Sequence, residues 1–243
     1  MTTVILFVFG AIVGSFLNVV GLRWGSGRTP GGRSSCPHCG KVLEWRELVP
    51  IVSFCLLKAR CRGCQAKISW QYPLIELWTG LVFVNVPYMF LPVFCIYTVI
   101  LVYDFTHKII PDALVYTSIV VALISRIVAG GSLWDWLAGP IIFSFFGLIW
   151  LLSRGRAMGF GDAKLGLSIG LLLGVAQGFS AIVFAFWVGA LSAVTHMFLH
   201  KVGFLKHAEK LTMRSEIPFA PFMIVSALIS LMFNLDILHV ASL

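Results

Sequence analysis

The segment "RAMGFGDAKLGLSIGLLLGVA", residues 156–176, sets the class of this protein, because it leads from a short polar stretch directly into an apolar run. Another apolar run, residues 134–153, precedes it. A helix that crosses a bilayer needs about 20 predominantly apolar residues. Asp162 stands at the start of such a run, where a carboxylate is costly and is by default a candidate functional group. The segment therefore predicts a membrane helix that carries a functional acid.

The composition of the whole chain agrees with this prediction. Of 243 residues, 59% are hydrophobic and 12% are charged, and the mean hydropathy is +0.95. A soluble domain carries about twice that charged fraction, and a membrane β-barrel would have short alternating segments instead of long apolar runs. The first run has no basic start and no obvious cleavage site for a signal peptide, so we expect it to be retained. The predicted fold class is an all-α polytopic membrane protein.

The apolar runs predict about eight transmembrane helices. They cover residues 3–22, 72–90, 91–107, 112–129, 134–153, 162–176, 178–199 and 217–238. The one long polar segment, residues 23–71, lies between the first two helices and is expected to form a small separate domain. The predicted organisation is therefore helix 1 at residues 1–22, a small domain at 23–71, and a transmembrane core of helices 2–8 at 72–243.

The net charge of +8 is distributed as a topology signal. With eight spans, 17 of the 18 Lys and Arg residues fall on one side of the membrane, and Arg126 alone tends to the other side. The positive-inside rule makes the basic side cytoplasmic and places both termini outside. The expected partner of these charges is the lipid bilayer with its anionic headgroups, and no nucleic acid is expected.

Four cysteines of the small domain form two C-x2-C pairs: Cys36, Cys39, Cys61 and Cys64. Two such pairs, separated by 21 residues, have the spacing of a tetrahedral zinc site. Four protein ligands leave no open position, so the zinc would be structural, and a domain this small needs such a support. Two disulfides are the alternative, which a reducing cytoplasm disfavours, and His38 is an alternative ligand.

Asp104 ends the third predicted helix and Asp162 begins the sixth, so two intervening helices return both carboxylates to the same membrane face. Two facing carboxyl groups suit aspartyl proteolysis, in which one is ionised and the other keeps its proton. Gly159 and Gly161 would let the backbone approach a peptide closely, and Lys164 would favour the ionised state of Asp162. The alternative is that Asp162 only caps a helix and Asp104 is only a solvated charge.

Several segments, taken in order, resemble the bacterial type IV prepilin peptidases. The matching stretches are "GSFLNVV" (14–20), "CPHCG" and "CRGC", "YPLIELWTG" (72–80), "YDFTHKIIPD" (103–112), "GFGDAKL" (159–165) and "IPFAPF" (217–222). The resemblance covers nearly the whole chain. In "IPFAPF" the family pattern has Gly where this chain has Ala220, and "GLRWGSGRTPGG" replaces a proline- and basic-rich turn.

The resemblance implies a GxGD-type intramembrane aspartyl protease of the bacterial cytoplasmic membrane. Such an enzyme removes the short basic leader of type IV prepilins or pseudopilins at the cytoplasmic face. It then methylates the new N-terminal residue with S-adenosylmethionine. The implied catalytic residues are Asp104 and Asp162, the implied zinc ligands are the four cysteines of the two pairs, and Lys108 and Lys164 are candidate supporting residues.

Glu76, early in the second predicted helix, matches a family position. It is a candidate for binding the methyl donor, for sensing the substrate amine, or for pairing with a basic loop residue. Two other functions stay open at this point. One is a peptidase that does not methylate. The other is a non-enzymatic transporter or scaffold, which the position of the acids at helix ends disfavours.

Overall fold

A computed structural model describes residues 1–27, 29, 31–156, 158–201 and 218–237. The described residues form helices and two isolated β-bridges, without a strand. The chain divides into two compact units, Met1–Tyr103 and Asp104–Leu243. The predicted all-α fold is confirmed.

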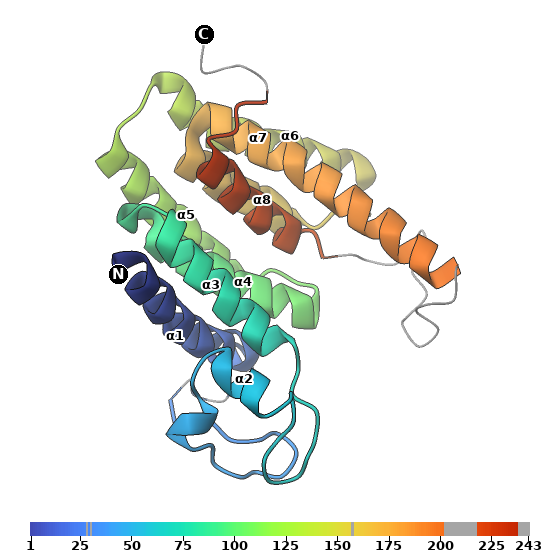
Figure 1. The fold of residues 1–243 in the computed structure, drawn as a ribbon. Helices are drawn as coiled ribbons and strands as arrows, with labels where there is room; N and C mark the ends of the chain where they lie inside the picture. Colours follow the sequence, from blue (N-terminus) through green and yellow to red (C-terminus); the bar gives the residue numbers. More distant parts are fainter. Residues whose placement is uncertain (28, 30, 157, 202–217, 238–243) are drawn as a thin grey trace. The chain divides into compact units, whose positions relative to one another are not determined.

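In the first unit, helix α1 (Thr2–Arg23) lies antiparallel beside helix α3 (Gln71–Asn85), as Figure 1 shows. Asn18 Oδ1 accepts a hydrogen bond from Gln71 Nε2 at 3.1 Å. A Cβ atom at Gly10 would lie 2.7 Å from the Cβ of Phe83. Glycine is therefore needed where the two helices come this close.

Residues 24–70 form a module between α1 and α3 that contains the 3-10 turn η1 (Trp45–Glu47) and the short helix α2 (Val52–Leu56). The buried Glu47 accepts a hydrogen bond from the backbone N–H of Glu44 at 2.9 Å and pairs with Lys41 at 3.2 Å. These two donors lower the pKa of the Glu47 carboxyl, since both favour its ionised form.

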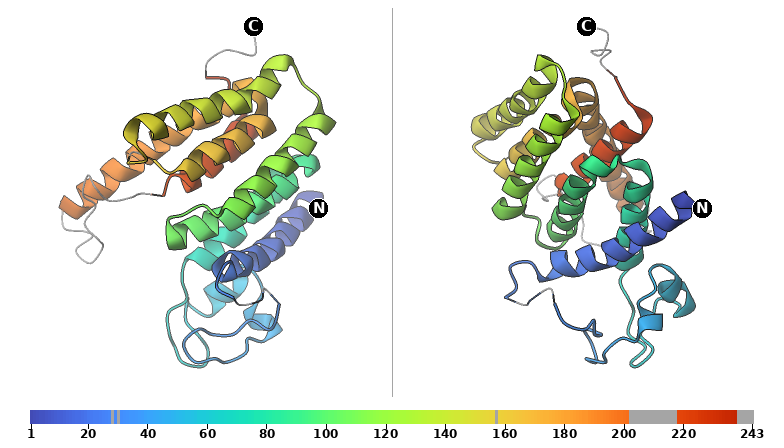
Figure 2. Two further views of the ribbon diagram at one scale, coloured as in Figure 1. Left: turned by 180° about the vertical axis from the view of Figure 1, so that it is seen from behind. Right: turned by 90° about the vertical axis from the view of Figure 1, so that its left-hand side faces the viewer.

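The 3-10 turn η2 (Tyr88–Phe90) leads into helix α4 (Leu91–His107), which is joined to α3 by a hydrogen bond from Trp78 Nε1 to Thr98 Oγ1 of 3.1 Å. The last turn of α4 belongs to the second unit. That unit continues with α5 (Asp112–Ala129), α6 (Leu133–Ser153), α7 (Phe160–Lys201) and α8 (Ala220–Phe233). Helix α7 packs against α5, α6 and α8 (Figure 2).

The eight predicted apolar segments correspond to helices of the described residues. Five helical segments among these residues are long and apolar enough to cross a membrane: α1, η2 with α4, α5, α6 and α7. Helices α3 and α8 match predicted segments but have only 15 and 14 residues. Helix α7 contains two predicted segments, and its 42 residues are interrupted at Gly174, three residues before the predicted break.

Gly174 has non-helical dihedral angles, φ 79° and ψ −170°, which break the backbone hydrogen bonds of α7. The carbonyl oxygens of Leu171 and Leu172 instead accept hydrogen bonds from the Arg126 guanidinium at 2.8 and 3.0 Å. The N–H of Val175 donates to the Asp135 carboxylate at 3.1 Å. Arg126, the one cation predicted on the opposite side, is therefore a buried partner of the broken helix.

Gly174→Ala is expected to destabilise the protein. Its Cβ would collide with the Asp135 carboxylate, and the left-handed φ is unfavourable for alanine, which together cost roughly 1–3 kcal/mol. Thermal unfolding in detergent measures the effect. Gly147→Ala in α6 is the matched control, because its Cβ meets nothing within 4 Å and alanine favours a helix. Equal unfolding temperatures for the two variants would contradict the role given to Gly174.

Candidate active site

The two predicted aspartates both lie in the second unit. Asp104 lies in the last turn of α4 and Asp162 in the first turn of α7, with exposed fractions of 3% and 9%. Their carboxyl groups are close enough to interact electrostatically. The Oδ2 atom of Asp104 is buried and has no hydrogen-bond partner among the described residues. A buried polar atom without a partner is unusual and marks a candidate functional site.

The short connection between α4 and α5 brings the two helix ends together. Lys108 has a left-handed φ of 55°, and its N–H donates to the carbonyl of Asp104 at 2.8 Å, so the chain turns sharply after α4. The connection then passes over the start of α7, where a Cβ atom at Gly161 would lie 3.0 Å from the Cβ of Ile110. Gly161 therefore permits the close approach that places Asp162 beside the end of α4.

Lys164 forms its ion pair with Asp112, not with Asp162. Its Nζ atom lies 2.6 Å from Asp112 Oδ1 and within 4.7 and 5.2 Å of the ring centroids of Tyr116 and Phe160. The contact between Lys164 and Asp112 was not predicted from the sequence. The pair joins the first turns of α5 and α7, and Lys108 lies exposed at the end of α4.

The arrangement provides two neighbouring carboxyl groups, largely withdrawn from solvent, at the ends of two helices. Like charges this close are costly, so such a pair favours one ionised and one protonated member. The ionised member can take a proton from water, and the protonated member can donate a hydrogen bond to a carbonyl oxygen. The site is therefore suited to acid–base chemistry on a polar substrate bond.

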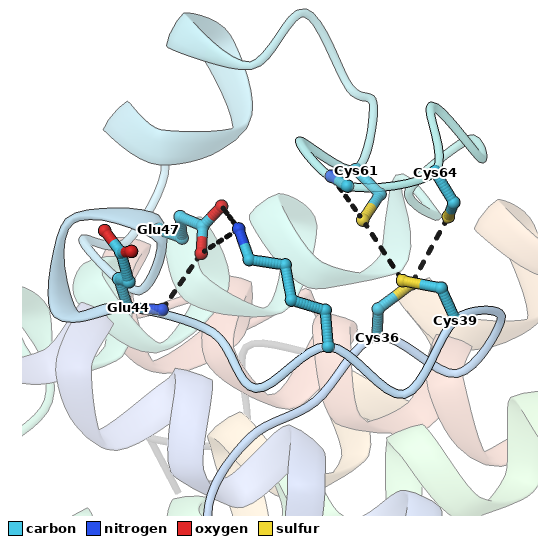
Figure 3. A network of polar contacts seen from close by, with 8 residues as sticks. Cys36, Cys39, Glu44, Glu47, Cys61 and Cys64 are labelled. Atoms are coloured by element: carbon cyan, nitrogen blue, oxygen red, sulfur yellow. Dashed lines mark hydrogen bonds and ion pairs between the residues drawn. The ribbon is translucent and has the colours of Figure 1, made fainter.

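The four cysteines of the module also come together (Figure 3). Their Sγ atoms all lie within 4.8 Å of one another, with Cys36 and Cys64 3.8 Å apart and Cys39 and Cys61 4.0 Å apart. Four thiolates at about 2.3 Å from a tetrahedral ion would be about 3.8 Å apart. The cluster therefore fits a metal ion that prefers four sulfur ligands.

The two C-x2-C turns have the same backbone pattern, which orients the thiols toward one point. The N–H of Gly40 donates to the carbonyl of Cys36, and the N–H of Gln65 donates to the carbonyl of Cys61, each at 2.9 Å. The backbone N–H groups of Cys64 and Gly63 lower the pKa of the Cys61 thiol to about 6. This favours the thiolate form of Cys61, which is the form that binds a metal ion.

Glu76 is buried in α3, where its carboxylate accepts a hydrogen bond of 2.7 Å from the backbone N–H of Ile51 in the module. The side chain of Ser15 in α1 also hydrogen-bonds to it. Ile51 has a left-handed φ of 62°, an unusual conformation for a β-branched residue. Glu76 therefore ties the module to the two helices, through a backbone donor and not through the basic loop residue considered from the sequence.

Sequence reasoning did not single out Asp112, Asp135 or Asn18 as structural partners. Asp112 and Lys164 are 52 residues apart, and Asp135 and Val175 are 40 apart, so no local pattern links them. Asn18 is fully buried and its Nδ2 atom has no partner among the described residues. A polar residue within an apolar run was the only signal for Asn18.

Two family models match this chain. Residues 8–90 match the bacterial peptidase A24 N-terminal domain, and residues 89–194 match the type IV leader peptidase family. The first match contains the cysteine cluster and Glu76, and the second contains Asp104 and Asp162. No solved structure gives a significant match.

Curated relatives agree with the family models. A Bacillus subtilis protein named prepilin leader peptidase/N-methyltransferase is 30% identical over 246 residues, which cover 95% of this chain and 94% of the relative. A Myxococcus xanthus protein of the same name is 37% identical, over 70% of this chain but only 46% of the relative. An Escherichia coli type 4 prepilin-like proteins leader peptide-processing enzyme is 31% identical, over 69% and 75% of the two chains. This chain belongs to the type IV prepilin leader peptidase family.

Proposed function

We propose that this chain is a bifunctional membrane enzyme. It removes the short basic leader of type IV prepilins or pseudopilins and then methylates the new N-terminal residue with S-adenosylmethionine. The observation that carries the peptidase activity is the buried pair of Asp104 and Asp162 in the second unit. The names of the relatives support the two activities together.

In the proposed cleavage, the ionised member of the aspartate pair takes a proton from a water molecule, which attacks the carbonyl carbon of the scissile peptide bond. The protonated member hydrogen-bonds the carbonyl oxygen. That proton then goes to the departing amine as the C–N bond breaks. The unpartnered Oδ2 of Asp104 supports this role, because a substrate or water can supply the missing hydrogen bond.

The substrate enters with its apolar helix in the bilayer and its basic leader in the cytoplasm. A carbonyl inside a helix is already hydrogen-bonded, so the cleavage site has to unwind before it reaches the aspartates. This requires the bacterial cytoplasmic membrane as the location, with the aspartates and the cysteine module on the cytoplasmic side and both termini outside. The distribution of Lys and Arg along the sequence supports this orientation.

We assign the metal of the module as zinc, with Cys36, Cys39, Cys61 and Cys64 as its ligands. A tetrahedral set of four thiolates is typical of structural zinc. When bound, the ion supplies a cross-link between the two C-x2-C turns and no reactive position. The residues of the module thereby hold Ile51 in place for its hydrogen bond with Glu76.

Asp104→Asn and Asp162→Asn are each expected to reduce leader removal by roughly 10²–10⁴-fold, because the amide can neither accept nor donate the transferred proton. Mass spectrometry of a matched prepilin, incubated with the enzyme in liposomes, measures the cleavage. Glu44→Gln, at an exposed acid of the module, is the control and should cleave normally. Cleavage that survives both aspartate substitutions would eliminate the aspartyl mechanism.

Methylation is tested in the same assay by adding S-adenosylmethionine. The mature pilin is expected to gain the mass of one methyl group with wild-type enzyme and none when the donor is omitted. A mature pilin without this mass gain in the presence of the donor would identify the non-methylating peptidase instead. Absence of both cleavage and methylation would favour the non-enzymatic alternative.

Purified protein is expected to contain about one zinc ion per chain, because one set of four thiolates is present. Metal analysis by mass spectrometry should find this ion lost in Cys36→Ser and retained in Cys55→Ser. Cys55 is the matched control, since it is exposed and lies outside the cluster. Equal zinc content in the two variants would exclude the proposed ligand set.

Lys164→Met is expected to lower the cleavage rate several-fold, roughly 3–10-fold, with little change in KM. The ion pair and ring contacts that hold the first turn of α7 would be lost, and each is worth about 0.2–1 kcal/mol. Exchange of the two charges, Lys164→Asp with Asp112→Lys, should recover part of the rate. No recovery, together with normal activity of Asp112→Asn, would remove the positioning role of this pair.

A further inference from the structure

The antiparallel packing of α1 and α3 gives the depth of each residue of the module relative to α1, a helix able to span a membrane. Asn18 pairs with Gln71, the first residue of α3. Asn18 is five residues before Arg23, the end of α1, which corresponds to about 7.5 Å along the helix. Measured along the helix axis, α3 therefore begins deeper than the level at which α1 ends.

The start of α2 lies deeper still. Glu76 accepts hydrogen bonds from the N–H of Ile51, the residue before α2, and from the side chain of Ser15. Ser15 is eight residues before the end of α1, or about 12 Å along the helix axis. The module thus places a short helix beside α3, at a depth where α1 is still apolar.

The outer side of α2 has the character of a lipid-facing surface. Val52 and Leu56 have exposed fractions of 51% and 77%, although both are aliphatic. In α3, Leu74, Leu77 and Leu81 are exposed by 40–57% and follow one helical face. Contiguous exposed apolar side chains of this kind mark an interaction surface.

A groove of about 580 Å³ lies between α2 and α3. Phe54 and Cys55 line it on one side and Pro73, Leu74 and Leu77 on the other. The groove is almost entirely apolar, and among the described residues that line it Lys58 alone is charged. Its volume is typical of sites that hold a small organic molecule.

We propose that α2 is embedded in the acyl layer of the bilayer and that this groove holds an acyl chain of a phospholipid whose anionic headgroup pairs with Lys58. The first argument is continuity, because the lining residues Leu74 and Leu77 belong to the exposed face of α3. Cations follow α2 at Arg60, Arg62 and Lys67, where a headgroup layer is expected.

The second argument is the length of α3. Its 15 residues correspond to about 22 Å, which is shorter than the apolar core of a bilayer, about 30 Å. The apolar side chains of α2 and of the groove lie beside the first turns of α3 and widen its apolar surface there. A wider apolar surface at this end of a short helix favours contact with lipid.

Photo-crosslinking of the full-length protein tests this proposal. A benzoylphenylalanine at Leu56, in liposomes of phosphatidylglycerol and phosphatidylethanolamine, is expected to form phospholipid adducts that mass spectrometry detects. The matched control is the same group at Glu44, an exposed acid of the module, which should give at least tenfold less adduct. Retained zinc would verify that the module is folded in both variants.

Equal lipid adducts at the two positions, or adducts at Leu56 only to protein, would overturn the proposal. A second variant tests the groove itself. Cys55→Trp fills the space between α2 and α3 and should reduce the phospholipid that native mass spectrometry finds bound, whereas Cys95→Ser should not. Unchanged lipid binding in Cys55→Trp would place the lipid elsewhere. These outcomes do not depend on leader cleavage, which is measured separately.

Discussion

The constraint on which the second unit depends is that backbone polar groups inside a membrane must find partners within the protein. At Gly174 the regular hydrogen bonding of helix α7 is interrupted. Two side chains of opposite charge bind the backbone groups that lose their partners there. The Arg126 guanidinium donates hydrogen bonds to the carbonyl oxygens of Leu171 and Leu172, and the Asp135 carboxylate accepts one from the N–H of Val175. Because the two charges are also close to each other, neither is left uncompensated.

The break at Gly174 also allows the two parts of α7 to make different contacts. The first part of α7 runs from Phe160 to Leu173 and carries Asp162. Its first turn packs against the α4–α5 connection at Gly161. The part after Gly174 is free to follow a different direction and to pack against α8, for example through the hydrogen bond between Ser230 and the carbonyl of Gln177 at 2.8 Å. In an unbroken helix both parts would follow one axis and could not be oriented independently for these two contacts.

The sequence predicted the helical fold and the cysteine cluster, because hydropathy and ligand spacing are local signals. Asp104 and Asp162 were assigned to one membrane face only by counting the two predicted helices between them. The sequence did not predict that Lys164 pairs with Asp112, or that the break of α7 comes at Gly174. Both depend on contacts between residues at least 40 positions apart. The role of Arg126 was missed for the same reason, since a lone cation at a helix end is ordinarily a topology signal.

The buried acids of the described residues differ in whether their carboxylate oxygens have hydrogen-bond donors. This difference separates acids with a structural role from acids suited to catalysis. Glu47 has Lys41 and the N–H of Glu44, and Glu76 has the N–H of Ile51, so both carboxylates are occupied by the module that they hold. Asp104 has an oxygen without a donor and a second carboxyl group as its neighbour. Burial of that kind destabilises the resting protein, and the attacking water, which donates a hydrogen bond, would relieve it. The unsatisfied oxygen beside a second carboxyl group therefore distinguishes Asp104 from Glu47 and Glu76.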